Sequence, residues 1–361
     1  MPAKNLVLDA SVPEEKATWR ELLSRWPERE VWADPDYVRL FTKPGERSVC
    51  IATDDAESGI LLPLILRPLD TLGWTDEGCA RFDATSPYGY GGPFQWGERS
   101  KTLATDFWSS FESWARDTHL AASFLRLSLF PEQRATPPCQ LVDKGENVVR
   151  TLELDEEALW ADYAHKVRKN VRRARRDGLA FEVDEAGKRL DAFLEIYHAT
   201  MDRNQADQGY YFDRDFFEAI IRDLAGQFVF FHVLQDRVVV STELVLLSAR
   251  HMYSFLGGTS SVAFRSRPND LLKHEASLWA RARGLDSFVL GGGYAPDDGI
   301  YKYKAAFAPK GGRSFQVAEW IHDQGAHDDL VEMRAGAERR AGVSWSPRED
   351  YFPAYRSSSS S

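Results

Sequence analysis

Three strand-like segments follow one another at close spacing in the second half of the chain. They are rich in β-branched and aromatic residues and cover residues 228–235, 238–247 and 251–256. Gln235-Asp236-Arg237 separates the first two, which is short enough for a hairpin. Pro268 then opens a helix-like segment to 283. Adjacent strands followed by a helix predict an α+β fold, not the strict strand–helix alternation of a doubly wound sheet.

The length and composition predict two lobes with real cores. The chain has 361 residues and an apolar fraction of 43%. Strand and helix patterns occur in the first half and restart near residue 148, so each lobe is expected to hold a mixed, mostly antiparallel sheet flanked by helices. The predicted division is an N-terminal lobe over 1–147, a catalytic lobe over 148–325, and a C-terminal helix with a disordered serine-rich tail over 326–361.

Charge and residue spacing exclude several classes of protein. The net charge of −10 argues against a chain whose whole surface coats nucleic acid, and DNA is not an expected partner. No apolar stretch approaches 18 residues and no signal peptide is recognisable, so we expect no membrane span and a cytoplasmic location. The three cysteines are widely spaced and no metal-binding spacing occurs, so no metal is expected.

A dense basic segment spans residues 166–176, where seven of eleven residues are Lys or Arg. Val167, Val171 and Ala174 recur at helical spacing and predict one buried seam. The basic face is either a phosphate-binding surface for RNA or a phosphorylated acceptor, or a solvated face paired with acids such as Glu156 and Glu157. The candidate phosphate-binding residues are Lys166, Arg168, Lys169, Arg172, Arg173 and Arg176.

Arg203 lies at the end of an amphipathic helix predicted over 192–204. Its guanidinium could form a forked contact with a substrate carboxylate or phosphate. The alternative is a cation that interacts with the dipole at the helix C-terminus.

Three glycines, at 291–293, follow a buried strand and lead into the sequence YAPDDGIYKYK, which ends at Lys304. Such a run lets backbone or ligand approach closely. The residues after it are either extended, with Tyr301 and Tyr303 on one side, or helical, with Lys304 one turn from Ile300. A lysine held beside a reacting carbonyl could stabilise an oxyanion. An exposed connector with ordinary surface lysines is the other interpretation.

Four segments together resemble a known family. They are KVRKNVRRARRDG (166–178), HATMDRNQADQG (198–209), PNDLLKHEASLWARARG (268–284) and LGGGYAPDDGIYKYKAAF (290–307). Their order and spacing over about 148–323 resemble the Fem-type aminoacyltransferases, a two-lobed branch of the GNAT acyltransferase superfamily. The first lobe is similar only loosely, through residues 31–41 and SPYGYGGPF (86–94).

The resemblance implies transfer of an aminoacyl group from charged tRNA to an amine, of a peptidoglycan precursor or of a small natural product. It implies catalytic roles for Lys304 and Tyr303 and acceptor binding by Arg203, with Arg39 near the place of the family's N-lobe lysine. Tyr294 and Glu243 are further candidates for substrate binding, and Glu243, Asp297 and Asp298 are candidates for the general base. The basic segment becomes a candidate contact for tRNA phosphates. Aminoacyl-tRNA would be a co-substrate, and no cofactor is expected.

Two alternatives remain. One is N-acyl transfer from a thioester of CoA or a carrier protein. GNAT enzymes of that kind bind the pyrophosphate with a glycine-rich loop that leads into a helix, whereas the corresponding link here, 260–269, has no glycine. Arg265 and Arg267 could bind phosphates instead. The other alternative is a binding module that keeps the fold without catalysis.

Overall fold

The computed structural model describes residues 5–55, 57–75, 79–293, 295 and 298–358. It divides into two compact units, and each is described by itself. Unit 1 comprises Met1–Pro27, Trp32–Lys144 and Phe315–Ser361, and unit 2 comprises Glu28–Val31 and Gly145–Ser314. The chain passes into unit 2 along β7 (Leu141–Thr151) and returns along β13 (Gly312–Ile321). Residues from 315 on therefore belong to unit 1, which differs from the predicted division at 325.

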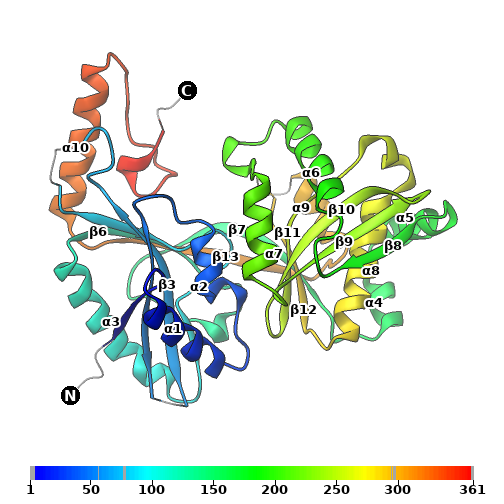
Figure 1. Cartoon of the computed structure of the whole chain (residues 1–361), viewed down its shortest axis with the longest axis horizontal. Coiled ribbons are helices and arrows are strands. Elements are labelled where there is room, and N and C mark those ends of the chain that lie inside the picture. Colours follow the sequence, from blue (N-terminus) through cyan, green and yellow to red (C-terminus); the bar gives the residue numbers. More distant parts are fainter. Residues whose placement is uncertain (1–4, 56, 76–78, 294, 296–297, 359–361) are drawn as a thin grey trace. The chain divides into compact units, whose positions relative to one another are not determined.

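Unit 2 contains a mixed sheet in which one pair of neighbours is parallel (Figure 1). The strand order is β7, β12, β11, β10, β9, β8; β11 and β12 run parallel, and the other described neighbours in this order are antiparallel. The hairpin between β9 and β10 turns through Asp236 and Arg237, which both have positive φ. Besides β7, the strands are β8 (Ala180–Asp184), β9 (Phe228–Gln235), β10 (Val238–Leu247), β11 (His251–Thr259) and β12 (Ser287–Gly291). The predicted mostly antiparallel α+β arrangement is confirmed.

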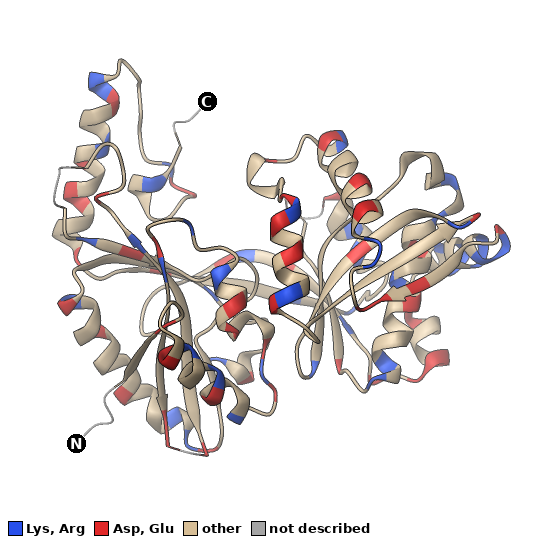
Figure 2. Cartoon of the chain, viewed as in Figure 1, with Lys and Arg blue, Asp and Glu red and all other residues tan. Residues whose placement is uncertain are grey.

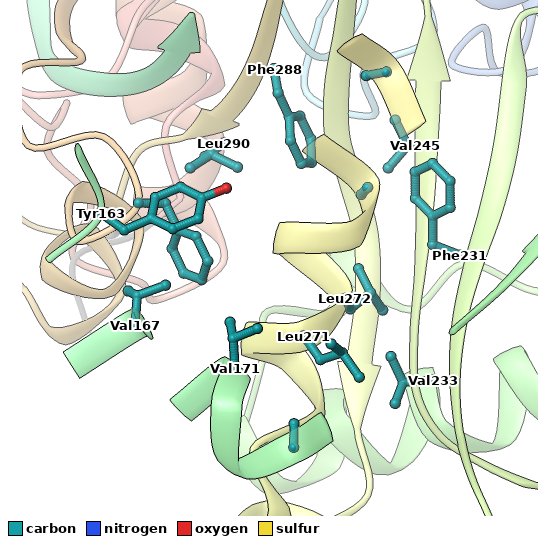
Figure 3. Close-up of a cluster of buried hydrophobic side chains, with 14 of the residues drawn as sticks. Tyr163, Val167, Val171, Phe231, Val233, Val245, Leu271, Leu272, Phe288 and Leu290 are labelled. Atoms are coloured by element: carbon teal, nitrogen blue, oxygen red, sulfur yellow. The ribbon is translucent and has the colours of Figure 1, made fainter. Parts of the chain in front are cut away.

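Helices cover both faces of this sheet. α8 packs between the sheet and α5, so that Val167 and Val171 of α5 point toward Leu271 of α8 (Figure 3). On the other face, the ring of Phe193 in α6 packs against Phe230 of β9, with 5.0 Å between their centroids. The helices are α4 (Glu156–Asp162), α5 (His165–Arg176), α6 (Leu190–Asn204), α7 (Arg214–Asp223), α8 (Pro268–Ala282) and α9 (Gly299–Ala305), with 3-10 turns at Gln208–Tyr210 and Ser261–Ser266.

The buried seam predicted for the basic segment is confirmed, because Val167, Val171 and Ala174 are the buried residues of α5. The sequence pattern predicts one continuous helix over 159–177, and this prediction is wrong, because the structure has two helices there. Tyr163 has an extended backbone, with φ −60° and ψ 143°, and separates α4 from α5. At this break the ring of Tyr163 is buried in the core and packs against the ring of Phe307.

Unit 1 contains the second mixed sheet, again with one parallel pair. The strand order is β1, β2, β3, β4, β6, β13; β4 and β6 are parallel, and β5 pairs with β3. The strands are β1 (Leu6–Asp9), β2 (Arg47–Asp54), β3 (Gly59–Pro68), β4 (Phe82–Thr85), β5 (Phe94–Trp96), β6 (Leu120–Arg126) and β13. The helices are α1 (Pro13–Arg25), α2 (Pro35–Arg39), α3 (Ser100–Asp117) and α10 (Gln324–Arg340), with 3-10 turns at Val31–Ala33, Pro131–Gln133 and Ala354–Arg356.

The chain end is more ordered than the serine-rich composition predicted. Arg356 donates hydrogen bonds to the buried carboxylate of Asp83, and Ser357 is 1% exposed. The expectation of a disordered serine-rich tail is therefore wrong for these two residues, because they pack against the sheet of unit 1. Ser359–Ser361 lie outside the described residues. Within the described chain, none of the helices is both long and apolar enough to cross a membrane.

Candidate active site

The segment that carries Lys304 is helical. α9 begins after Asp298, whose carboxylate accepts a hydrogen bond from the backbone N–H of Tyr301 at 2.7 Å. This cap stabilises a helix of seven residues, which is too short to be stable by itself. Of the two conformations considered for this segment, the helix is the one that forms. The carboxylate of Asp298, a candidate for the general base, therefore serves as the N-cap of α9.

Two of the glycines before α9 occupy positions where a residue with a side chain would be strained or would clash. Gly291 ends β12 with a φ of +84°, in the left-handed region that other residues rarely adopt. A Cβ on Gly293 would lie 2.4 Å from Oδ1 of Asp298. The chain can therefore turn sharply out of β12 and let the capping carboxylate approach the backbone.

The ammonium of Lys304 is held against the backbone at the end of β12. Its Nζ donates a hydrogen bond to the carbonyl oxygen of Gly292 at 2.7 Å, and the residue is half-buried. Burial lowers the pKa of Lys304 to about 8; the charge of Lys273 also lowers it, whereas Glu243 and Asp298 raise it. Since an ammonium has three N–H donors and one is used here, Lys304 keeps donors for a further oxygen.

A buried ion pair joins α8 to β10. Nζ of Lys273 donates to Oε1 of Glu243 and, at 2.8 Å, to the hydroxyl of Ser254. The same hydroxyl donates to Oε1 of Glu243. Lys273 and Glu243 are each 5% exposed. Oε2 of Glu243 has no hydrogen-bond partner in the described part of the chain, so this oxygen is able to accept a proton or a hydrogen bond from a ligand.

Tyr303 belongs to the same group of side chains. Its hydroxyl is buried and makes no hydrogen bond within the described residues, although the amide of Asn269 lies near it. Burial raises the pKa of Tyr303 well above its usual value, and the charges of Asp270 and Glu243 raise it further. The hydroxyl is therefore neutral at physiological pH and can donate a hydrogen bond.

These groups gather where two parallel strands part. β11 and β12 pair only from His251↔Ser287 to Tyr253↔Val289. Ser254 is the next residue of β11, and a register shift between β10 and β11 occurs at this position. Beyond Val289, β12 pairs only with β7 and leads to the carbonyl of Gly292 that Lys304 contacts. The separation of the two strands thus places two contact points just beyond the end of their pairing. Ser254 contacts Lys273 there, and the carbonyl of Gly292 contacts Lys304.

Arg203 is in the last turn of α6 and is exposed. Its guanidinium donates to Oγ1 of Thr200 at 3.2 Å and lies over the ring of Phe264, 5.1 Å from the centroid. Thr200 packs against Gly258, and a Cβ at position 258 would lie 2.2 Å from Oγ1 of Thr200. α6 covers the face of the sheet opposite to α8, so Arg203 and Lys273 come from different faces. The sequence hypothesis that Arg203 and the segment 291–304 form one site would need contact between them, and none is among the described contacts; acceptor binding by Arg203 stays a prediction.

The remaining predicted residues are dispersed. Arg39 belongs to unit 1, is exposed, and contacts Asp36 at 3.4 Å, a carboxylate that also pairs with Lys16. Tyr294 and Asp297 lie outside the described residues.

The helix α5 is dense in Lys and Arg (Figure 2). Some of these side chains are paired within the protein and others are open. Arg168 donates to backbone carbonyls, Arg173 pairs with Asp177, and Arg172 lies over the ring of Trp160. Among the described residues, no ion pair forms at three exposed members of this face, Lys166, Lys169 and Arg176. Part of this face is thus paired within the protein, and phosphate binding by the rest of it stays a prediction.

Sequence reasoning missed Lys273 and Ser254. A signal existed, because Glu243 interrupts the apolar run VVVSTELVLL and a buried carboxylate needs a cationic partner. Finding that partner requires the fold, since Lys273 is 30 residues away. The described residues contain no group of three or more His, Cys, Asp or Glu side chains that could hold a metal ion.

A known family model matches most of unit 2. Residues 161–305 match the model of the acetyltransferase (GNAT) domain, and this range includes Glu243, Lys273 and Lys304. A comparison with proteins of curated function finds no significant match.

Three solved structures share the fold at low sequence identity. FemX is 13% identical with a TM-score of 0.66, covering 87% of this chain and 97% of FemX. A conserved protein of unknown function from Bacteroides thetaiotaomicron is 10% identical with a TM-score of 0.55, covering 84% and 97%. The C-terminal domain (DUF2156) of a protein described as a lysylphosphatidylglycerol synthetase, from Agrobacterium fabrum, is 16% identical with a TM-score of 0.53, covering 90% and 97%.

The resemblance found in the sequence is therefore confirmed at the level of fold and superfamily. The chain has a FemX-like fold, and its residues 161–305 match the acetyltransferase (GNAT) domain.

Proposed function

We propose that the protein transfers an aminoacyl group from aminoacyl-tRNA to an amine and forms an amide bond. The observation that carries this proposal is the half-buried ammonium of Lys304, held by the carbonyl of Gly292 beside the buried pair of Lys273 and Glu243. A preorganised cation in a partly dehydrated site stabilises the oxyanion that forms in acyl transfer. The acceptor amine could belong to a peptidoglycan precursor or to a natural product.

The proposed reaction needs no covalent enzyme intermediate. The neutral amine attacks the ester carbonyl, a C–N bond forms, and the C–O bond to the tRNA ribose breaks. Lys304 stabilises the carbonyl oxygen as it becomes negative, and Tyr303 shapes the site and donates a hydrogen bond. The proton that leaves the amine passes to the departing ribose oxygen, either directly or by way of Oε2 of Glu243. An ester is already activated, so positioning and charge stabilisation suffice.

The start of α8 argues against CoA as the donor. In this helix the first turn holds the carboxyl group of Asp270, which is 6% exposed and accepts a hydrogen bond from Asn170 at 3.1 Å. Burial raises the pKa of Asp270. The preceding Arg267 has a φ of +60°, and Pro268, the first residue of the helix, has no N–H. A pyrophosphate would therefore meet an acidic side chain and fewer backbone donors than a glycine-rich loop offers.

Acyl transfer from a thioester is the second candidate, because the matched domain is described as an acetyltransferase. Arg265 and Arg267 are exposed in the link between β11 and α8 and could contact the phosphates of CoA.

One experiment separates the two donors. Purified protein is incubated with tRNA charged with radiolabelled amino acids and with a low-molecular-weight extract as the source of amines. Base-stable radiolabelled product is expected, and it should disappear when ribonuclease is added first. Product that survives ribonuclease, or that forms only with acetyl-CoA, contradicts the proposal and favours the thioester donor.

The open part of the basic helix is expected to bind tRNA phosphates. Replacing Lys166, Lys169 and Arg176 by alanine should weaken tRNA binding and make the slope of log K against log salt less steep by about 2 to 3 units, because each lost phosphate contact releases roughly one counterion fewer. Binding is measured by filter retention at several salt concentrations. The control replaces three exposed cations elsewhere, Lys101, Arg339 and Arg340. An equal change in both triple variants would contradict a specific role for α5.

The rate is expected to depend on the charge of Lys304. Because burial lowers the pKa of this residue to about 8, the cation predominates below that pH and is lost above it. If the cation stabilises the oxyanion, kcat/KM falls as the pH rises through about 8. The measurement is a pH–rate profile with a fixed donor. A rate that instead rises through this pH would mean that Lys304 acts as a base.

A further inference from the structure

Arg126 in unit 1 is a half-buried cation for which the described residues provide no carboxylate partner. It is the last residue of β6. Ala84 and Leu125 pack in the core with α3, so Thr85, Phe124 and Arg126 point to the opposite face of the sheet. There the guanidinium lies over the ring of Phe124, 5.0 Å from its centroid. Arginines at such positions usually pair with an acid.

The nearby acid is already occupied. The carboxylate of Asp83 accepts hydrogen bonds from Arg67 at 2.6 Å, from Arg356, and from the hydroxyl of Tyr355 at 3.1 Å. The leading electrostatic neighbours of Arg126 are the hydroxyl groups of Tyr88, Tyr37 and Tyr351 and the cation of Arg67. This face of the sheet thus carries an excess of positive charge near Arg126.

The glycine-rich segment SPYGYGG (86–92) is folded around Arg126. Oγ of Ser86 accepts a hydrogen bond from the backbone N–H of Arg126 at 2.8 Å, and the carbonyl of Ser86 accepts one from the guanidinium at 3.0 Å. A Cβ on Gly91 would lie 3.1 Å from the carbonyl oxygen of Arg126. The hydroxyl of Tyr37 donates to the carbonyl of Tyr88 at 2.7 Å and fixes the segment from the other side. The proposed acyl transfer gives no role to this segment.

One edge of the Arg126 guanidinium donates hydrogen bonds to the described residues, and the other edge does not. NH1 of Arg126 makes the contacts to Ser86 and, at 3.4 Å, to Oγ1 of Thr85. Nε and the second terminal nitrogen make no hydrogen bond to the described residues. These two parallel donors match the two oxygens of a carboxylate. A phosphate dianion would need more cationic charge than one arginine supplies.

We propose that Arg126 and the segment 86–92 form a binding site for the carboxylate group of an amino-acid-like or peptide ligand. The rings of Phe124, Tyr88 and Tyr351 offer apolar surface to the part of the ligand next to its carboxylate; Tyr88 and Tyr351 are 39% and 45% exposed. Binding of a carboxylate by Arg126 does not depend on the proposed function. The identification of this ligand as the amine acceptor rests on that function.

The test is a titration of the full-length protein, labelled with [15N]arginine, with N-acetyl-L-tyrosinate. Spectra of the Arg126→Lys variant identify the Nε–H resonance of Arg126. This resonance is expected to shift with N-acetyl-L-tyrosinate and to stay unchanged with N-acetyl-L-tyrosinamide, which lacks the carboxylate. Inorganic phosphate is the third arm. No shift with the carboxylate, an equal shift with the amide, or a larger response to phosphate each overturns the proposal.

Ligand-detected NMR measures the affinity of the variants. Arg126→Lys keeps the charge but loses the fork, so about tenfold weaker binding is expected, and Arg126→Met should abolish binding. Arg116→Lys is the matched control, because Arg116 is exposed on α3 and its side chain hydrogen-bonds, among the described residues, to Ser113 alone. If a variant is unstable in thermal melts, the wild-type comparison of carboxylate with amide still decides. No acyl donor is present, so the outcome is independent of whether the protein transfers aminoacyl groups.

Discussion

Replacing Lys304 by methionine is expected to lower kcat/KM by about a hundred- to a thousand-fold, the usual effect of removing one oxyanion-stabilising donor. The physical reason is that the ammonium is fixed by the carbonyl of Gly292 and acts in a site where burial strengthens electrostatic interactions. The loss should lie in kcat, because the interaction grows as the carbonyl oxygen becomes negative. Single-turnover transfer from charged tRNA measures it.

The matched control for this prediction is Lys302→Met, on the same helix but exposed. It should keep the wild-type rate, and both variants should show wild-type melting curves. Lys304→Arg retains a cation with a different shape and should recover only part of the activity. Full activity of Lys304→Met in a folded protein would exclude the proposed role and would favour a binding module without catalysis.

Replacing Lys273 by methionine is expected to lower the free energy of unfolding by roughly 3 to 5 kcal/mol. The substitution leaves Glu243 as a buried carboxylate whose remaining described donor is the hydroxyl of Ser254. Neither member of the pair can regain water without opening the core between α8 and the sheet. Chemical denaturation followed by circular dichroism measures the change.

The double variant Lys273→Met, Glu243→Leu is the informative control. Replacing both charges by apolar groups of similar size removes the unpaired carboxylate, so much of the stability should return. Activity separates the structural role from the chemical one: if Oε2 of Glu243 accepts the amine proton, the stable double variant remains slow. A Lys273→Met variant that is as stable as the wild type would contradict a buried ion pair.

Local patterns in the sequence were sufficient for much of unit 2. The strands β9 and β10 have the predicted bounds, and α5 buries the three residues that its spacing indicated. These features follow from periodicity and from glycine and proline signals, which act over a few residues. The family resemblance of four ordered segments then directed attention to Lys304. Its place on a helix was left open, because seven residues do not form a stable helix without the cap from Asp298.

The tertiary structure alone decided which distant side chains form a group. It paired Glu243 with Lys273, placed both near Lys304 and Tyr303, and put Arg203 on the other face of the sheet. It also surrounded Arg126 with a glycine-rich segment 34 to 40 residues earlier in the chain. Such pairings depend on strand order and on which helix covers which face. Residue spacing determines the face that each side chain occupies within its own element, but only packing determines what lies opposite that face.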